Sequence, residues 1–511
     1  MDRRNGPITR RRILGLGTMA AASILAACGG AGSATDTAPT KAATSGTTGA
    51  PTTGAPATSA STVAATTGAA ATSAPAGTSA PAAPAVPLPS SQVSNATATT
   101  GTTSMAATGP KPMVKGNLTV MRGTGGDDLW NARVADFKAK MGVTVNMVVT
   151  TGNVDDGTIP TALKSGSGPD TVNVNSGPSR VGFLAQANLI RPLDDAYKTY
   201  GWESKLVPAV IDRLKNQGKI YAGKIWEFPA TIDVIYWNYH KDVYAKAGIK
   251  PPTTFDEMNA NFEKLKGIGV YPLHLPARTN TPPGWLFGNL VQSAAGRDGV
   301  ADVLFADGKW DQPSFLQAAT TLSDWGKKEY ISKEVAALTD TESYPIFAAK
   351  KSATYCVGTW AIANYTDAMA DFANIDSFEV PKMTPQGTSI PTGGFGNSWV
   401  VAADSKNPDA AYAWIDYLFS DEVITKGFDD PRASSIPTVK LPASAKPKTA
   451  LLAKAIDVLG KDGTGYNPSV HLPPTVASVY FESLQGIVAG LIAPDKAMAN
   501  IQAAKVKAAS Q

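Results

Sequence analysis

The residue types that most often carry catalysis are few in this chain and poorly spaced for it. The three histidines, His240, His274 and His471, lie far apart and have no metal-ligand spacing. The sequence lacks the G-x-S-x-G, H-E-x-x-H and P-loop motifs. Adjacent aspartates occur in four pairs, but such neighbours need not converge on one sugar, as a glycosidase requires. These residues predict no enzyme, no metal and no other cofactor.

Tryptophan is the more informative residue type, with ten in the chain. An indole offers a rigid apolar face to the C–H patches of a sugar ring. Trp360 follows an expected buried strand at 353–357 and a Gly358-Thr359 turn. In open α/β sheets, ligands bind beyond the carboxyl ends of the strands. We therefore predict that Trp360 stacks on a ligand, with a core position as the alternative.

Two more places could bring side chains to the same edge. Trp285 follows a Pro-Pro-Gly run, where we expect a loop. Asn175 and Ser176 stand between an expected strand and a helix opened by Pro178. Side chains and unpaired N–H groups at such a helix start can meet a ligand.

Strand and helix signals alternate from about Lys115 to the end of the chain. One apolar helix face is indicated by spacings of four, three and four residues, at Trp130, Val134, Phe137 and Met141. Such alternation favours an α/β fold with mainly parallel sheets.

Three local patterns add detail to this plan. Thr254 and Glu257 have capping-box spacing, and Asn407 precedes a proline at an expected helix start. Residues 219–238 interrupt the alternation with three short β-rich runs. We expect two helical stretches at the end of the chain, about 476–489 and 494–508.

The first 28 residues have the pattern of a bacterial export signal. Residues 9–14 resemble a twin-arginine motif, and 13–27 form an apolar stretch too short to span a membrane. Leu-Ala-Ala-Cys at 25–28 resembles a lipobox, whose cysteine is diacylated in lipoproteins. We predict a signal peptide at 1–27 and a lipidated Cys28. Two acyl chains would hold the exported protein on the outer face of the cell membrane.

A long low-complexity segment follows Cys28. From Gly29 to Pro110 the sequence is almost entirely Ala, Thr, Ser, Gly and Pro, and Asp36 and Lys41 are its only charges. Such a composition cannot bury enough apolar surface to offset its ordering entropy. We predict that residues 28–112 are a disordered tether and that 113–511 fold.

Charge and cysteine content exclude several classes of protein. Residues 1–27 hold five arginines and one aspartate, so the rest of the chain is neutral and does not suit a general nucleic-acid binder. Cys28 and Cys356 are the only cysteines, too few for a disulfide scaffold. The sequence has no run of about 20 apolar residues that would predict a spanning helix.

Five segments, taken in order, resemble the family 1 extracellular solute-binding proteins of ABC importers, a maltose-binding-protein-like family. Two departures are the extra residues before Lys241-Asp242 and Lys350 in place of the usual glycine. The segments are 218–258, 347–365, 393–422, 432–437 and 479–504.

The resemblance implies a two-lobed periplasmic-binding-protein-like fold of type II. Two α/β lobes would be joined by hinge segments, with a ligand cleft between them. The implied lobe one is about 115–230 and 391–440, and lobe two is about 235–385 and 445–511. The implied crossings lie near 230–234, 385–391 and 441–446.

The resemblance also implies ligand contacts. Trp360, Trp285, Tyr480 and Phe481 occupy positions where the family uses aromatic residues, and Phe395 stands in a Gly-Gly-Phe-Gly turn that often carries tryptophan. Asp233 takes the place of an acidic sugar ligand, with a hinge hydrogen bond as the alternative.

The implied function is that of a lipid-anchored, monomeric, extracytoplasmic binding component of an ABC importer. It would capture a sugar or oligosaccharide and deliver it to the transmembrane permease subunits, with no nucleic-acid partner. Other solutes of the family, namely polyamines, glycerol phosphate compounds and iron, remain alternatives, as does a secreted glycoside hydrolase.

Overall fold

The structure is a computed structural model, and it describes residues 111–124, 126–154, 157–215, 221–279, 281–461 and 463–510. The predicted signal peptide, the lipidated Cys28 and nearly all of the predicted tether lie outside the described residues. Lys111, which the prediction assigned to the tether, forms an ion pair with Asp416 at 2.7 Å. The folded part therefore includes Lys111, because its ammonium group is paired with the buried carboxylate of Asp416.

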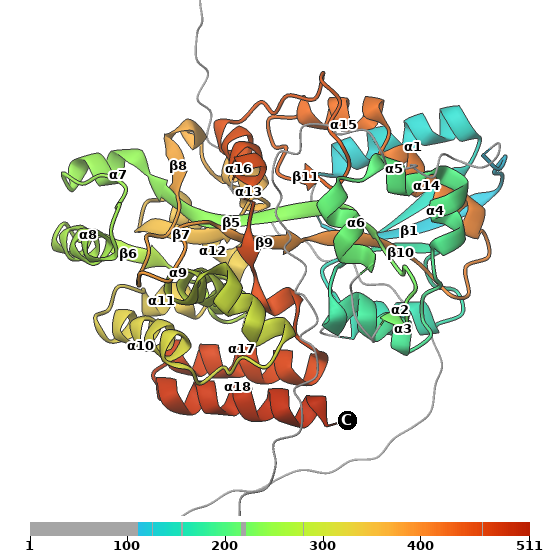
Figure 1. Cartoon of the computed structure of the whole chain (residues 1–511). Helices are drawn as coiled ribbons and strands as arrows, with labels where there is room; N and C mark the ends of the chain where they lie inside the picture. Colours follow the sequence, from blue (N-terminus) through green and yellow to red (C-terminus); the bar gives the residue numbers. More distant parts are fainter. Residues whose placement is uncertain are drawn as a thin grey trace, which may run out of the picture. The chain divides into compact units, whose positions relative to one another are not determined.

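The first lobe is the part of the chain built on a sheet with the strand order β2-β1-β3-β10-β4 (Figure 1). β1, β2 and β3 run parallel, and β10 runs antiparallel to both β3 and β4. Its strands are β1 (Asn117–Gly123), β2 (Thr144–Thr150), β3 (Thr171–Asn175), β4 (Phe228–Pro229) and β10 (Asn397–Val401). Its helices are α1 (Asp127–Met141), α2 (Thr158–Lys164), η1 (Pro178–Gly182), α3 (Phe183–Gln186), α4 (Asp194–Tyr200), α5 (Trp202–Lys205), α6 (Pro208–Lys215), α14 (Pro408–Leu418) and α15 (Asp421–Phe428).

The second lobe is built on a sheet with the order β12-β9-β5-β7-β6, and β8 and β11 also pair with β5. β5 runs antiparallel to β7, β8, β9 and β11, so the expected mainly parallel arrangement is wrong for this sheet. Its strands are β5 (Thr231–His240), β6 (Tyr271–His274), β7 (Ser352–Gly358), β8 (Ile375–Phe378), β9 (Thr392–Phe395), β11 (Ile436–Pro437) and β12 (Gly465–Tyr466).

The helices of the second lobe pack largely on one another. α9 contacts α10 and α17, and α18 contacts α10 and α17, which gives the helical layer seen below the sheet in Figure 1. They are α7 (Lys241–Lys246), α8 (Phe255–Gly267), α9 (Thr281–Phe305), α10 (Pro313–Lys327), α11 (Lys333–Ala336), α12 (Asp340–Ala348), α13 (Ala361–Ala368), η3 (Phe372–Asn374), α16 (Ala450–Lys461), η4 (Pro468–Val470), α17 (Pro474–Val488) and α18 (Pro494–Ala509). Within the described residues, we find no helix whose length and apolar character would let it cross a membrane.

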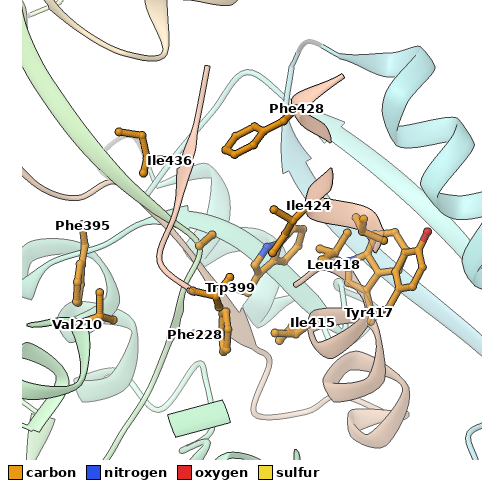
Figure 2. Packing of buried hydrophobic residues seen from close by; sticks show 14 of the residues in the cluster. Val210, Phe228, Phe395, Trp399, Ile415, Tyr417, Leu418, Ile424, Phe428 and Ile436 are labelled. Atoms are coloured by element: carbon orange, nitrogen blue, oxygen red, sulfur yellow. The ribbon is translucent and has the colours of Figure 1, made fainter. Parts of the chain in front are cut away.

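The core follows the alternation of side chains along the strands. On β5, Val234 and Tyr236 belong to one buried cluster, whereas Ile235 and Trp237 belong to another on the opposite face of the sheet. The first cluster continues into the first lobe, where Figure 2 shows aromatic and aliphatic side chains packed together. Each face of the second sheet is therefore covered by its own core.

Local sequence signals succeeded at helix ends with one exception. Gly142 ends α1 in the left-handed conformation, and the Thr254–Glu257 capping box is present. Asn407 stands before α14, but its side chain does not cap the helix. Its Nδ2 instead donates to Lys115 O at 2.8 Å, because β1 begins beside this helix start.

The chain passes between the lobes at places that differ in part from the expectation. Thr392–Phe395 lies in the range predicted for lobe one, yet it pairs with β5 of the second sheet. The passage into the first sheet occurs at Gly396, between β9 and β10, rather than at 385–391. Pro385 and Pro391, which suggested a hinge at 385–391, come before β9. Because β9 pairs with β5, the second lobe includes residues up to Phe395.

Candidate functional site

The candidate site lies where β5, β9, β10 and β11 meet, which we call the crossover. The first residues of β5 pair on two sides, with Ile436–Pro437 of β11 and with Thr392–Phe395 of β9. Figure 1 shows β5 and the β9–β10 segment running from one sheet toward the other. Side chains that project here can reach residues of both lobes.

Gly396 is a point of close approach at the crossover. Its N–H donates to Thr231 O at 2.9 Å, and its carbonyl accepts from Ser176 N at 2.9 Å. A Cβ at this position would collide with the carboxylate of Asp233. Glycine is required because the space of a side chain is already filled by that carboxylate.

Asp233 is half-buried on β5, opposite Gly394 of β9. Burial raises the pKa of its carboxyl group to about 7, and a hydrogen bond with Thr231 opposes the rise in part. Near neutral pH the group can therefore donate or accept a hydrogen bond, which suits both a hydroxyl-binding role and the alternative role at the hinge.

Trp360 stands at the predicted strand-to-helix turn, between β7 and α13. Thr359 N donates to Val234 O at 3.1 Å, which ties this turn to β5. The indole lies over Gly358, where a side chain would clash with the ring. Trp360 is half-buried and contacts both core clusters, so it lies at their boundary.

Trp285 lies next to Trp360, with ring centroids 4.8 Å apart and an interplanar angle of 65°. It is also half-buried and also contacts both core clusters. The expected loop is wrong here, because Trp285 lies in the first turns of α9. The fold thus brings together two of the predicted stacking residues, from α9 and from the end of β7.

Tyr480 and Phe481 belong to the core of the second lobe rather than to an open surface. Tyr480 is 0% exposed and its hydroxyl donates to Gly284 O at 3.0 Å. Phe481 is 7% exposed, and both rings lie against Gly284. Because α17 turns these residues toward α9, they support the helix start that carries Trp285, and this conformation does not expose them to a ligand.

Phe395 is likewise buried, at 4% exposure, and Figure 2 shows it beside Val210. The guanidinium carbon of Arg213 lies 4.2 Å from the centroid of its ring. The β9 strand turns this ring into the core, so Phe395 holds Arg213 and offers no open stacking face.

Asn175 and Ser176 end at the crossover but differ in exposure. Asn175 is exposed at the end of β3, whereas Ser176 is 1% exposed. The next residue, Gly177, lies against Val470 O of the second lobe. A Cβ at position 177 would be 2.5 Å from that oxygen, so a side chain would not fit. The two lobes therefore touch at this segment, and Asn175 is the accessible residue of the pair.

Sequence reasoning missed the charged and titratable residues beside Phe395. Arg213 interacts electrostatically with Glu227 and Tyr221 of the first lobe and with Tyr466 of the second. Burial and the charge of Arg213 hold the pKa of His471 well below its ordinary value, so this imidazole is neutral. No local motif marks these residues, because they come from α6, from the segment before β4 and from the residues around η4.

The described residues contain no group of three or more His, Cys, Asp or Glu side chains that could hold a metal ion. Cys356 is buried in β7 at 1% exposure, and burial raises its thiol pKa well above the ordinary value. The site therefore offers aromatic faces, a carboxyl group, a guanidinium and an imidazole, which are groups that bind polar organic molecules.

A model of the bacterial extracellular solute-binding protein family matches residues 132–453. The uncharacterized ABC transporter extracellular-binding protein PH1214 of Pyrococcus horikoshii is 25% identical over 337 residues, which are 64% of this chain and 71% of that protein. A probable sugar-binding periplasmic protein of Mesorhizobium japonicum is 32% identical over 113 residues, 22% of this chain and 26% of its own length.

Solved structures with the same fold include carbohydrate-binding proteins. A chitin oligosaccharide binding protein has a TM-score of 0.67 at 22% identity and covers 77% of this chain and 99% of its own. Maltose-bound MalE3 of T. maritima has a TM-score of 0.64 at 18% identity, covering 78% and 100%. At these identities the likeness concerns the fold, and the predicted two-lobed α/β fold is confirmed.

Proposed function

The chain belongs to the bacterial extracellular solute-binding proteins, the binding components of ABC transporters, and we propose that it captures a sugar or oligosaccharide at the crossover. The observation that carries this proposal is the Trp285–Trp360 pair, half-buried where the two core clusters meet. The turn that carries Trp360 is hydrogen-bonded to Val234, the residue after Asp233, and aromatic faces together with a carboxyl group are the combination that sugars require.

The relatives support the carbohydrate class. Solved proteins with this fold bind chitin oligosaccharide, maltose and β-D-galactopyranose. Asp233 is the acidic residue closest to Gly396, and its raised pKa weakens its attraction for a polycation. This favours a neutral sugar over a polyamine.

The mechanism we propose is capture followed by closure. A ligand that contacts both lobes stabilises the closed arrangement by the difference between its affinities for the closed and open states. The loaded, monomeric protein then docks on the transmembrane permease subunits and releases the solute to them. Its own residues bind and orient the sugar and perform no bond-breaking step.

Calorimetry tests the ligand class directly. The purified full chain is titrated with maltotriose, N,N′-diacetylchitobiose, xylotriose and D-galactose, and separately with spermidine, glycerol 3-phosphate and ferric citrate. Saturable binding of at least one sugar supports the proposal. Binding confined to the second set contradicts it, and release of reducing ends from a bound oligosaccharide would instead favour the glycoside hydrolase.

Export and anchoring form a separate part of the proposal. Residues 1–27 direct export, Cys28 carries the acyl chains, and the segment from 28 to 110 holds the binding domain away from the membrane on its outer face. Cys28→Ala should move the protein from the membrane fraction to the soluble fraction, because two acyl chains provide the anchor. Retention of this variant in washed membranes would contradict lipidation at Cys28.

A further inference from the structure

Arg213 is held at the crossover by two residues of β9. Its guanidinium carbon lies 4.2 Å from the centroid of the Phe395 ring. Its Nη1 lies 2.9 Å from the place where a Cβ on Gly394 would be. Gly394 also has a φ of 149°, which side chains rarely adopt. The sequence Gly394-Phe395 thus provides both the space and the platform for one guanidinium group.

This guanidinium has donors but no acceptor among the described residues. Its contacts there are the Phe395 ring and the longer-range charges of Glu227, Tyr221 and Tyr466. By contrast, Arg191 donates from Nε to Ala402 O at 3.1 Å and from Nη2 to Ala403 O at 2.6 Å. Arg213 is half-buried, and a guanidinium carries five N–H donors, so the donors without a described acceptor can serve a ligand.

Groups from both lobes surround Arg213. Glu227 and Tyr221 approach from the first lobe, and Tyr466 and His471 from the second. Burial lowers the pKa of Arg213, and the neighbouring Glu227 opposes that change. An acceptor placed at this guanidinium would therefore lie between the lobes.

The charge balance indicates an uncharged acceptor. Glu227 is 0% exposed and already offsets the positive charge of Arg213. Asp233 lies on the other side of Gly394 and carries part of a negative charge near pH 7. A carboxylate or phosphate on the ligand would add negative charge to a region where burial already disfavours it.

We propose that Arg213 is a specificity-determining ligand residue that donates hydrogen bonds to neighbouring hydroxyl oxygens of an uncharged sugar. The planar fork of its donors fits two acceptors side by side. Phe395 orients the fork from β9, and the glycines at 394 and 396 keep the crossover open for the guanidinium and for Asp233. This inference rests on the proposed function, since it presumes a sugar ligand.

The first test removes the donors and keeps the apolar stem. For the sugar that binds most tightly among maltotriose, N,N′-diacetylchitobiose, xylotriose and D-galactose, Arg213→Met in the full chain should raise Kd by about 10- to 100-fold. Arg213→Lys should keep part of the affinity, because an ammonium still donates but lacks the fork. An unchanged Kd in Arg213→Met overturns the inference.

Arg133 provides a matched control in the same lobe. Its guanidinium carbon lies 4.7 Å from the Trp130 ring, and burial lowers its pKa to about 10. It interacts with Tyr417 and Asp430, away from β9. Arg133→Met removes an arginine that is half-buried and ring-stacked, as Arg213 is, and should leave Kd unchanged. If it weakens sugar binding as much as Arg213→Met does, the effect is not specific to the crossover and the inference fails.

The second test concerns charge. The sugar that binds is compared with its uronate, for example D-galactose with D-galacturonate, at pH 7.5. We expect the uronate to bind at least about tenfold more weakly to the wild-type chain, and tighter binding of the uronate overturns the assignment to an uncharged ligand. A wild-type chain that binds none of the sugars defeats the proposed function together with this inference. Sugar binding that is insensitive to Arg213→Met defeats the inference alone.

Discussion

Two groups of buried polar residues in this molecule differ in how they are partnered. The interior cluster, inside the second lobe, consists of His240, His274, Asp340, Tyr344 and Tyr355. Asp340 accepts from the hydroxyls of Tyr344 and Tyr355, and His240 Nε2 bonds Phe347 O at 2.8 Å. Each of the five side chains has at least one partner within this lobe, although His240 Nδ1 and His274 Nε2 are buried without one, so the cluster contributes to folding.

The crossover group consists of Asp233, Arg213, His471, Trp285 and Trp360. Its members come from both lobes, the guanidinium of Arg213 lacks an acceptor among the described residues, and the two indoles are half-buried. The comparison teaches that burial alone does not separate a core residue from a binding residue. What separates them is whether the same lobe supplies the hydrogen-bond partners and covers the rings.

The largest expected effect concerns a tryptophan of the core. Trp237 is 0% exposed and packs edge-on against Trp325, with ring centroids 6.0 Å apart. Trp237→Ala should lower the free energy of unfolding by about 3–5 kcal/mol, because it removes a packed ring and leaves a cavity. Urea denaturation measures the loss, and Trp237→Phe should lose less. A loss of unfolding free energy below about 1 kcal/mol in Trp237→Ala would show that Trp237 contributes no more to stability than is expected of the half-buried Trp360.

Trp360 should behave in the opposite way. Trp360→Ala should weaken sugar binding by about 2 kcal/mol, roughly thirtyfold in Kd, because an anchoring aromatic face is removed. Trp360→Phe should retain part of the affinity, and both variants should stay folded. Titration calorimetry with the sugar that binds, alongside circular dichroism, checks both statements. If Trp360→Ala is unfolded, or if it binds the sugar as tightly as wild type, Trp360 is a core residue and not a ligand contact.

The interior cluster should make the protein acid-sensitive. Burial lowers the pKa of His274 to about 3, whereas the unfolded side chain titrates near 6.5. As pH falls from 7 to 5, the unfolded state binds a proton that the folded state does not, so stability drops by about 2 kcal/mol through this residue. His274→Gln should lose that component in urea titrations at several pH values.

Other members of the cluster set the remaining pH dependence. His240 acts in the same direction, because burial lowers its pKa to about 4. Asp340 acts in the opposite direction, because burial raises its pKa to about 6 and the folded state gains protons first. Equal pH slopes for wild type and His274→Gln would show that His274 is not held neutral by burial.

The smallest expected effect concerns Asp233. Its folded pKa of about 7 lies above the unfolded value, so the folded state gains stability as pH falls through 7. Between pH 8 and 6 the gain should be about 1 kcal/mol, and Asp233→Asn should abolish it. Thermal melts of both chains without sugar measure the difference. If the variant keeps the wild-type dependence, another group titrates at the crossover.

The local patterns of the chain predicted much of the fold because they act over a few residues. The capping box at Thr254, the left-handed Gly142 and the strand preceding Trp360 lie where the sequence placed them. The patterns failed where long-range pairing decides. Tyr221 and Ala222 looked β-rich but lie outside any strand, and Thr392–Phe395 joins the second sheet through β5.

The sequence by itself determined the family, the two-lobed α/β class and the position of Trp360 at a strand-to-helix turn, because motif order, periodicity and turn chemistry can be read along the chain. Only the tertiary structure decided which aromatic residues remain accessible. Tyr480 and Phe395 look like Trp360 in sequence, yet α17 and β9 turn them inward. Arg213 became a candidate only when β9 placed a ring and a glycine against its guanidinium, since side-chain burial depends on contacts between residues far apart in sequence.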